Sequence, residues 1–226
     1  MRCAPCYNSQ ILQLYDNTIR ESLQSILNIT LTEIAWRQAT LPVRNGGIGI
    51  RLATQVALPA FLSSVASSST LVLTLLPHSL HCSAGINDQL FTVAVEKWKE
   101  QSGQNELPQL ITTQKAWELP LVGVVVERVL SAAPNQAGIA RLLAAAAPHS
   151  GAFLQVLPCS AIGTRLDDTS LRVAVALRLG VPVCAPHTYA CEVRDSAMYG
   201  LPMHQNYFSP ANKKFPEHFT PTINIL

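Results

Sequence analysis

The segment CAPHTYACEVRDSAMYGLPMH, residues 184–204, carries two cysteines and two histidines in one short polar stretch. Cys184 is followed by His187 and Cys191, and His204 comes after a longer gap. Thiolate sulfur and imidazole nitrogen are ligand types that a tetrahedral zinc ion prefers. Structural zinc sites usually take their ligands from two closely spaced pairs, however, and His204 has no close partner. The spacing therefore favours a loop whose two cysteine thiols bind no metal over a zinc site, and we expect no cofactor.

Three arginines surround a glycine-rich stretch in WRQATLPVRNGGIGIR, residues 36–51. They are Arg37, Arg44 and Arg51. Asn45, Gly46 and Gly47 predict a tight turn, because these residue types adopt positive backbone angles at low cost. A dinucleotide-binding loop would need a preceding strand and a glycine in place of Leu52, so we interpret the turn as structural. The default interpretation of the arginines is a set of solvated surface residues, and the alternative is a small nucleic-acid-binding face that contacts phosphates.

Two further groups could suggest catalysis. Asp167 and Asp168 precede an apolar helical pattern, where an aspartate accepts hydrogen bonds from the first amides of a helix. A metal-binding pair of the polymerase type lies instead at a hairpin tip between strands, so the pattern favours helix capping. His149 and Ser150 have no assignable acidic partner, and their sequence predicts a helix break. We expect no catalytic residue in the chain.

The charge and hydropathy patterns limit the partners. The net charge is +2 and 13% of residues are charged, so any contact with nucleic acid must be local. The first ten residues lack an apolar run, which predicts an intracellular protein without a signal segment. Residues 52–87 contain no charged side chain, but the prolines and serines within them favour a buried helix followed by a serine-rich loop. We therefore expect no membrane partner.

Helical periodicity dominates the chain. Apolar residues at steps of three and four predict an amphipathic helix over residues 8–27, with this stripe: Leu12, Tyr15, Ile19, Leu23 and Ile26. Thr32 is expected to cap a second helix that ends before Pro42 and turns Trp36 toward the core. Later helices are predicted around residues 91–98, 121–130, 139–146 and 171–179. The predicted fold is mostly α, an irregular helical bundle with a poorly ordered C-terminal tail.

Several phrases occur together and in order along the chain. They are RCAPC, SILN, WRQATLPVRNGGIGIR, LPAFLSS, QKAWELP, ARLLAAAAPHSGAFLQVLP and LRVAVALRLGVPVCAPH. In this combination the chain resembles the C-terminal part of reverse-transcriptase polyproteins from non-LTR retrotransposons of animals. The resemblance implies a helical thumb-like segment with the glycine turn at 1–52 and a helical linker at 53–181. It further implies a degraded zinc-knuckle-like segment with a tail at 182–226.

The departures from the family pattern imply that catalytic activity and metal binding have been lost. Asp167 and Asp168 do not match the paired aspartates of the polymerase palm, so no polymerisation is expected, and the acidic residues of the endonuclease are absent. In the knuckle, Tyr189, Tyr199 and Met203 stand where the family has metal ligands. The resemblance thus implies a catalytically incompetent remnant that binds RNA or DNA weakly if at all. The alternative is an inert or protein-interaction remnant that self-associates through exposed apolar surface.

Overall fold

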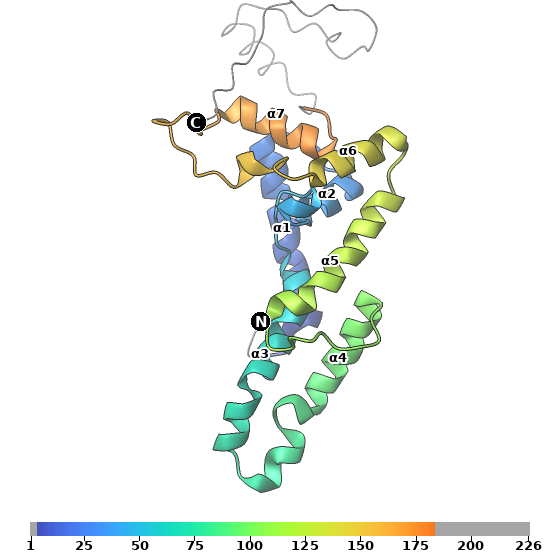
Figure 1. Cartoon of the computed structure of the whole chain (residues 1–226), viewed down its shortest axis with the longest axis vertical. Coiled ribbons are helices and arrows are strands. Elements are labelled where there is room, and N and C mark those ends of the chain that lie inside the picture. The colour runs from blue at the N-terminus through green and yellow to red at the C-terminus, as the bar shows by residue number, and fades with distance from the viewer. Residues whose placement is uncertain (1–3, 184–226) are drawn as a thin grey trace, which may run out of the picture. The chain divides into compact units, whose positions relative to one another are not determined.

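The computed structural model describes residues 4–183, and over that range the fold is helical without strands (Figure 1). The predicted mostly α fold class is confirmed for these residues. The helices are α1 (Gln10–Leu27), α2 (Glu33–Thr40), α3 (Ala53–Leu75), α4 (Gln89–Ser102), α5 (Gln114–Ser131), α6 (Gln136–Ala146) and α7 (Asp168–Leu179). Short 3-10 turns link several of them, including Val43–Asn45 after α2. Of the predicted C-terminal segment at 182–226, residues 184–226 lie outside the described residues.

Helix α1 lies where the periodicity predicts it, but its buried face differs from the expected stripe. Leu12 and Leu27 are buried, whereas Tyr15 and Ile26 are 55% and 67% exposed. The buried face also includes Asp16, because its carboxylate accepts hydrogen bonds from the start of α3. The inclusion of Tyr15 and Ile26 in the apolar stripe was therefore wrong, since a polar residue takes a place on the inner face.

Helix α2 begins and ends as its sequence predicts. The hydroxyl of Thr32 accepts a hydrogen bond from the N–H of Ala35 at 3.2 Å, which satisfies one of the free amides at the helix start. Trp36 is buried against the apolar side chains of α1 and α7. Leu41 is extended and ends the helix, because the residue before Pro42 avoids helical geometry.

Helix α3 continues through the serine-rich stretch, so the predicted loop there was wrong. Ser68, for example, donates to the carbonyl of Ser64 at 2.8 Å, which satisfies the hydroxyl within the helix. Pro59 lies inside the helix and is buried. Among the described residues, α3 alone is long and apolar enough to cross a membrane, and half of its most apolar window is buried within the fold. The expectation of no membrane partner stays a prediction.

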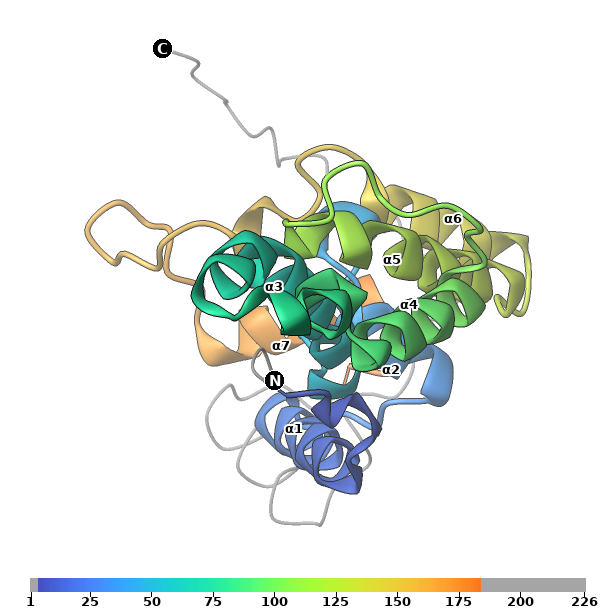
Figure 2. The ribbon, with the colours of Figure 1, turned by 90° about the horizontal axis from the view of Figure 1, so that it is seen from below.

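Two large hydrophobic clusters hold the helices together. The first joins the end of α1 to α2 and α7 through residues such as Leu27, Trp36 and Leu179. The second joins α3, α4 and α5, where the indole of Trp117 packs edge-on against that of Trp98 at 5.0 Å. Figure 2 shows these three helices beside one another in a second view. Contacts between α1 and α3 and between α2 and α5 cross the expected boundary at residue 52, and the three-segment division stays a prediction.

Candidate nucleic-acid interface at the glycine turn

The turn after α2 is closed by its own backbone. The N–H groups of residues 45–50 all donate to carbonyl oxygens of residues 39–43, at 2.8–3.3 Å. No amide in that run is therefore left to cradle a phosphate, which agrees with a structural turn rather than a nucleotide loop. Any anion contact at the turn must come from side chains.

The glycines of the turn meet two different requirements. Gly46 and Gly49 have positive φ angles of +87° and +82°, which favour glycine. Asn45 and Gly47 do not, so the expectation of positive angles there was wrong. Gly47 is needed for space, because a Cβ atom would lie 1.9 Å from the carbonyl oxygen of Leu41. The chain thus passes against its own backbone at Gly47.

A buried amide side chain ties the turn to the last helix. Gln38 of α2 is fully buried, and its Nε2 donates to the carbonyl oxygens of Gly46 and Arg178, both at 2.9 Å. Its Oε1 accepts a hydrogen bond from Arg141 at 3.0 Å. Since both polar atoms of the amide have partners, burial of Gln38 is compatible with a stable core.

Arg178 of α7 holds the turn from the other side. Only 7% of this residue is exposed. Its Nη2 donates to the carbonyl oxygen of Val43 at 2.7 Å, and its Nε donates to that of Gly47 at 2.9 Å. A third, longer contact of 3.4 Å joins Nη1 to the hydroxyl of Ser150. One guanidinium therefore binds both ends of the turn.

Arg141 of α6 completes the cluster. It donates to the carbonyl oxygen of Arg178 as well as to Gln38. Gly180 makes room for it, because a Cβ atom there would lie 2.4 Å from the Arg141 Nε. Within residues 4–183 neither Arg141 nor Arg178 has a carboxylate partner, and burial lowers the pKa of both side chains. Carbonyl and amide oxygens replace the lost hydration of these two cations.

The three arginines predicted to contact phosphate are all on the surface around this turn. Arg37 pairs with Glu33 one helical turn away, at 3.3 Å, and Arg51 pairs with Glu118 of α5. Among the described residues, the Arg44 side chain makes one hydrogen bond, a long one of 3.4 Å to the side chain of Asn45, and no ion pair. Arg44 is therefore the predicted contact residue whose charge is least neutralised by its neighbours.

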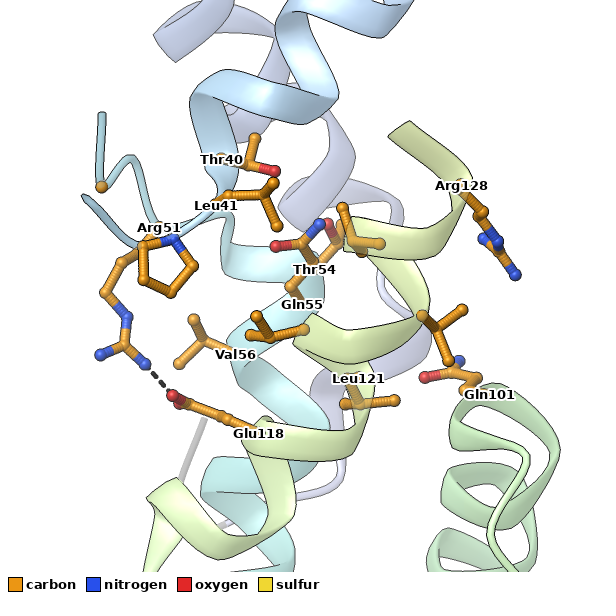
Figure 3. A pocket seen from close by; sticks show the side chains of 15 residues that line it. Thr40, Leu41, Arg51, Thr54, Gln55, Val56, Gln101, Glu118, Leu121 and Arg128 are labelled. Carbon is orange, nitrogen blue, oxygen red and sulfur yellow. Dashed lines mark hydrogen bonds and ion pairs between the residues drawn. The ribbon is translucent and has the colours of Figure 1, made fainter. Parts of the chain in front are cut away.

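A groove of about 570 Å³ lies beside the turn, between the start of α3 and α5. Its floor is mainly apolar, with Leu41, Val56 and Leu121 among the side chains that line it. Figure 3 shows the Arg51–Glu118 ion pair at one side and Arg128 at the other. Arg128 is exposed, and its guanidinium makes no hydrogen bond or ion pair with any other described residue, although its carbonyl oxygen accepts hydrogen bonds from Ser131 and Ala132. The groove therefore offers a cation that sequence reasoning missed.

The predicted metal ligands Cys184, His187, Cys191 and His204 lie outside the described residues. Within residues 4–183, no group of three or more potential ligands could hold a metal ion. Comparison of the chain with protein-family models, curated proteins and solved structures gave no match.

Sequence reasoning also missed the buried arginines. A signal for Arg178 was present, because it follows Val175 by three residues and so lies on the inward face of α7. Its partners Val43 and Gly47 are more than 130 positions away, so their contact required the structure.

Proposed function

We propose that this chain is a catalytically incompetent piece of a non-LTR retrotransposon reverse-transcriptase polyprotein, from the thumb and linker region. In this proposal it acts inside the cell and retains at most a weak contact with RNA or DNA. Its mechanism is positional, since arginines at the glycine turn contact phosphates while the helices hold the turn in place.

One observation carries the proposal. The phrases that give the family resemblance are far apart in the sequence, yet their polar side chains and backbone carbonyl groups meet in one largely buried cluster. WRQATLPVRNGG contributes Gln38, Val43 and Gly47, ARLLAAAAPHSG contributes Arg141 and Ser150, and LRVAVALRLG contributes Arg178. Because the family-like phrases form one structural unit, they support a common origin of this chain and that family better than scattered similarities would.

The charges around the turn support a weak contact rather than a strong one. Glu33 and Glu118 already pair with Arg37 and Arg51, and a phosphate must compete with both carboxylates. These ion pairs are exposed, so each is worth about 1 kcal/mol or less and is exchangeable. Because Arg37 and Arg51 are already paired among the described residues, we expect binding in the non-specific range, with a duplex dissociation constant of about 1–100 µM at physiological salt.

Fluorescence anisotropy with a labelled RNA–DNA primer-template duplex tests the proposal at two salt concentrations. The expected result is micromolar binding that weakens as salt rises. The double variant Arg44→Gln, Arg51→Gln should bind more weakly, and Arg165→Gln, Arg172→Gln is its control because it removes the same charge from exposed positions elsewhere. No binding by the wild-type protein at concentrations up to about 100 µM would reject nucleic-acid contact.

The second candidate is an inert or protein-interaction remnant, and exposed apolar residues favour it. Leu71 and Leu75 near the end of α3 are 62% and 75% exposed, and Ile11 on α1 is 74% exposed. Surface of this kind suits contact with a missing partner or with a second copy. Light scattering after size-exclusion chromatography separates the candidates, since oligomers without duplex affinity favour the second.

A further inference from the structure

A single side chain spans the turn that carries Arg44. The Arg178 guanidinium binds the carbonyl oxygen of Val43, just before Arg44, and that of Gly47, three residues after it. Two nitrogens of one rigid, planar group thereby fix the separation of both ends of the loop. The backbone of Arg44 lies between these two anchors.

The turn has little space to move toward Arg178, because the residues that surround the turn are also closely packed. A Cβ atom at Gly151 would lie 2.2 Å from a methyl carbon of Val43 and 3.1 Å from the Arg178 Nη2. On the other side, the buried Gln38 binds the carbonyl oxygen of Gly46. The loop is therefore held from α2, from α7 and from the segment after α6.

Arg178 is too buried to contact a ligand itself, since only 7% of it is exposed. Any effect of its hydrogen bonds on a bound phosphate therefore passes through the turn, and Arg178→Lys keeps the charge so that this effect can be separated from a purely electrostatic one. We infer that Arg178 is a positioning residue that holds Arg44 ready for phosphate contact. This inference rests on the proposed function, because it names how the binding surface is kept in shape.

Limited proteolysis with trypsin measures the order of the turn without any ligand. Arg165 lies in an exposed segment before α7 and supplies a reference cleavage site in the same molecule. In Arg178→Gln we expect cleavage after Arg44 to rise about tenfold relative to cleavage after Arg165, because the loop opens locally. Arg178→Lys should give a smaller rise, since one ammonium group does not span both carbonyls. Arg172→Gln, an exposed arginine on the same helix, should change neither site.

Duplex binding then tests the positioning role through a double-mutant cycle. Arg44→Gln and Arg178→Gln should weaken binding by similar factors, and the double variant should bind no more weakly than Arg44→Gln alone. The slope of the logarithm of the binding constant against that of salt concentration should fall by about 0.9 in each case, as expected for one lost phosphate contact. Where Arg178→Gln does not unfold cooperatively, Arg178→Lys takes its place in the cycle.

The outcomes separate this inference from the proposed function. If the wild type binds and the losses from Arg44→Gln and Arg178→Gln add up in the double variant, the inference is wrong but the proposed function stands. The same holds if the wild type binds and the Arg178 substitutions do not change binding. Unchanged cleavage after Arg44 in both Arg178 variants also overturns the inference. Absence of wild-type binding overturns the proposed function, and the inference with it, whatever the cleavage assay shows.

Discussion

The carboxylate of Asp16 accepts a hydrogen bond from the backbone N–H of Ala53 at 2.7 Å, so a residue of α1 caps the start of α3. The same carboxylate accepts from the N–H and the hydroxyl of Thr54. The residue before α3, Leu52, offers no capping side chain of its own. The contact thus replaces a local cap with one from 37 positions earlier in the chain.

Loss of this contact should destabilise the fold. We expect Asp16→Ala to lower the free energy of unfolding by about 2–3 kcal/mol, because buried amides lose their acceptor. Asp88→Ala is the matched control, since Asp88 caps α4 locally and near the surface, and it should cost about 1 kcal/mol. Urea unfolding followed by tryptophan fluorescence measures both. Equal losses in the two variants would contradict a special role for Asp16.

A methyl group at Gly47 should be far more harmful than one at Gly123. The Cβ atom of Gly47→Ala would overlap the carbonyl oxygen of Leu41, whereas that of Gly123→Ala has nothing within 4 Å. We expect a loss of about 3 kcal/mol or more for Gly47→Ala. Gly123→Ala should instead stabilise α5 by about 0.5–1 kcal/mol, because alanine favours a helix. Thermal unfolding of both variants provides the comparison. If Gly47→Ala left the stability unchanged, the turn would be less tightly packed than the structure shows.

Local signals in the sequence predicted much of the helical framework. Thr32 and Asp167 begin helices, because a side-chain oxygen beside the first amides acts within three residues. The serine-rich stretch misled the same reasoning, since its hydroxyls bind helix carbonyls instead of ending the helix.

The candidate site was predicted less completely than the framework. Arg37, Arg44 and Arg51 lie around the glycine turn because they are its sequence neighbours. Arg141 and Arg178 reach the turn only after the chain has folded, and no local pattern encodes that contact. Buried polar clusters of this kind depend on tertiary packing.

The ion pairs of Glu33 predict a dependence of stability on pH. Burial acts to raise the pKa of Glu33, but hydrogen bonds and charges from Arg20 and Arg37 outweigh it, so its pKa lies below the ordinary 4.5. The stability from these pairs is therefore present above pH 4.5 and lost as pH falls through the lower folded-state pKa. Since the pairs are exposed, the amount is about 1 kcal/mol or less.

Substitution of Glu33 should reduce that dependence. Glu33→Gln should unfold more easily than the wild type near pH 7, and the two proteins should converge in acid. Glu106→Gln is the control, because Glu106 is exposed and makes no hydrogen bond or ion pair with another described residue. Urea titrations between pH 7 and pH 3 make the comparison, and a constant difference at every pH would argue against the ion pairs.

The zinc content of the whole chain tests the expectation of no cofactor. Because the spacing of Cys184, His187, Cys191 and His204 lacks a second ligand pair, we expect less than about one-half zinc atom per chain after purification. Atomic absorption measures the content. One tightly held zinc per chain that is lost in Cys184→Ser would show that the segment has kept a working site.

Arginine modification by phenylglyoxal, read out by mass spectrometry with and without a primer-template duplex, tests the account most directly. In the free protein Arg44, Arg51 and Arg172 should react, whereas the buried Arg178 should not. The duplex should protect Arg44 and Arg51 and leave Arg172 unchanged. Equal reactivity of Arg44 and Arg51 with and without saturating duplex, or a reactive Arg178 in the free protein, would contradict the account.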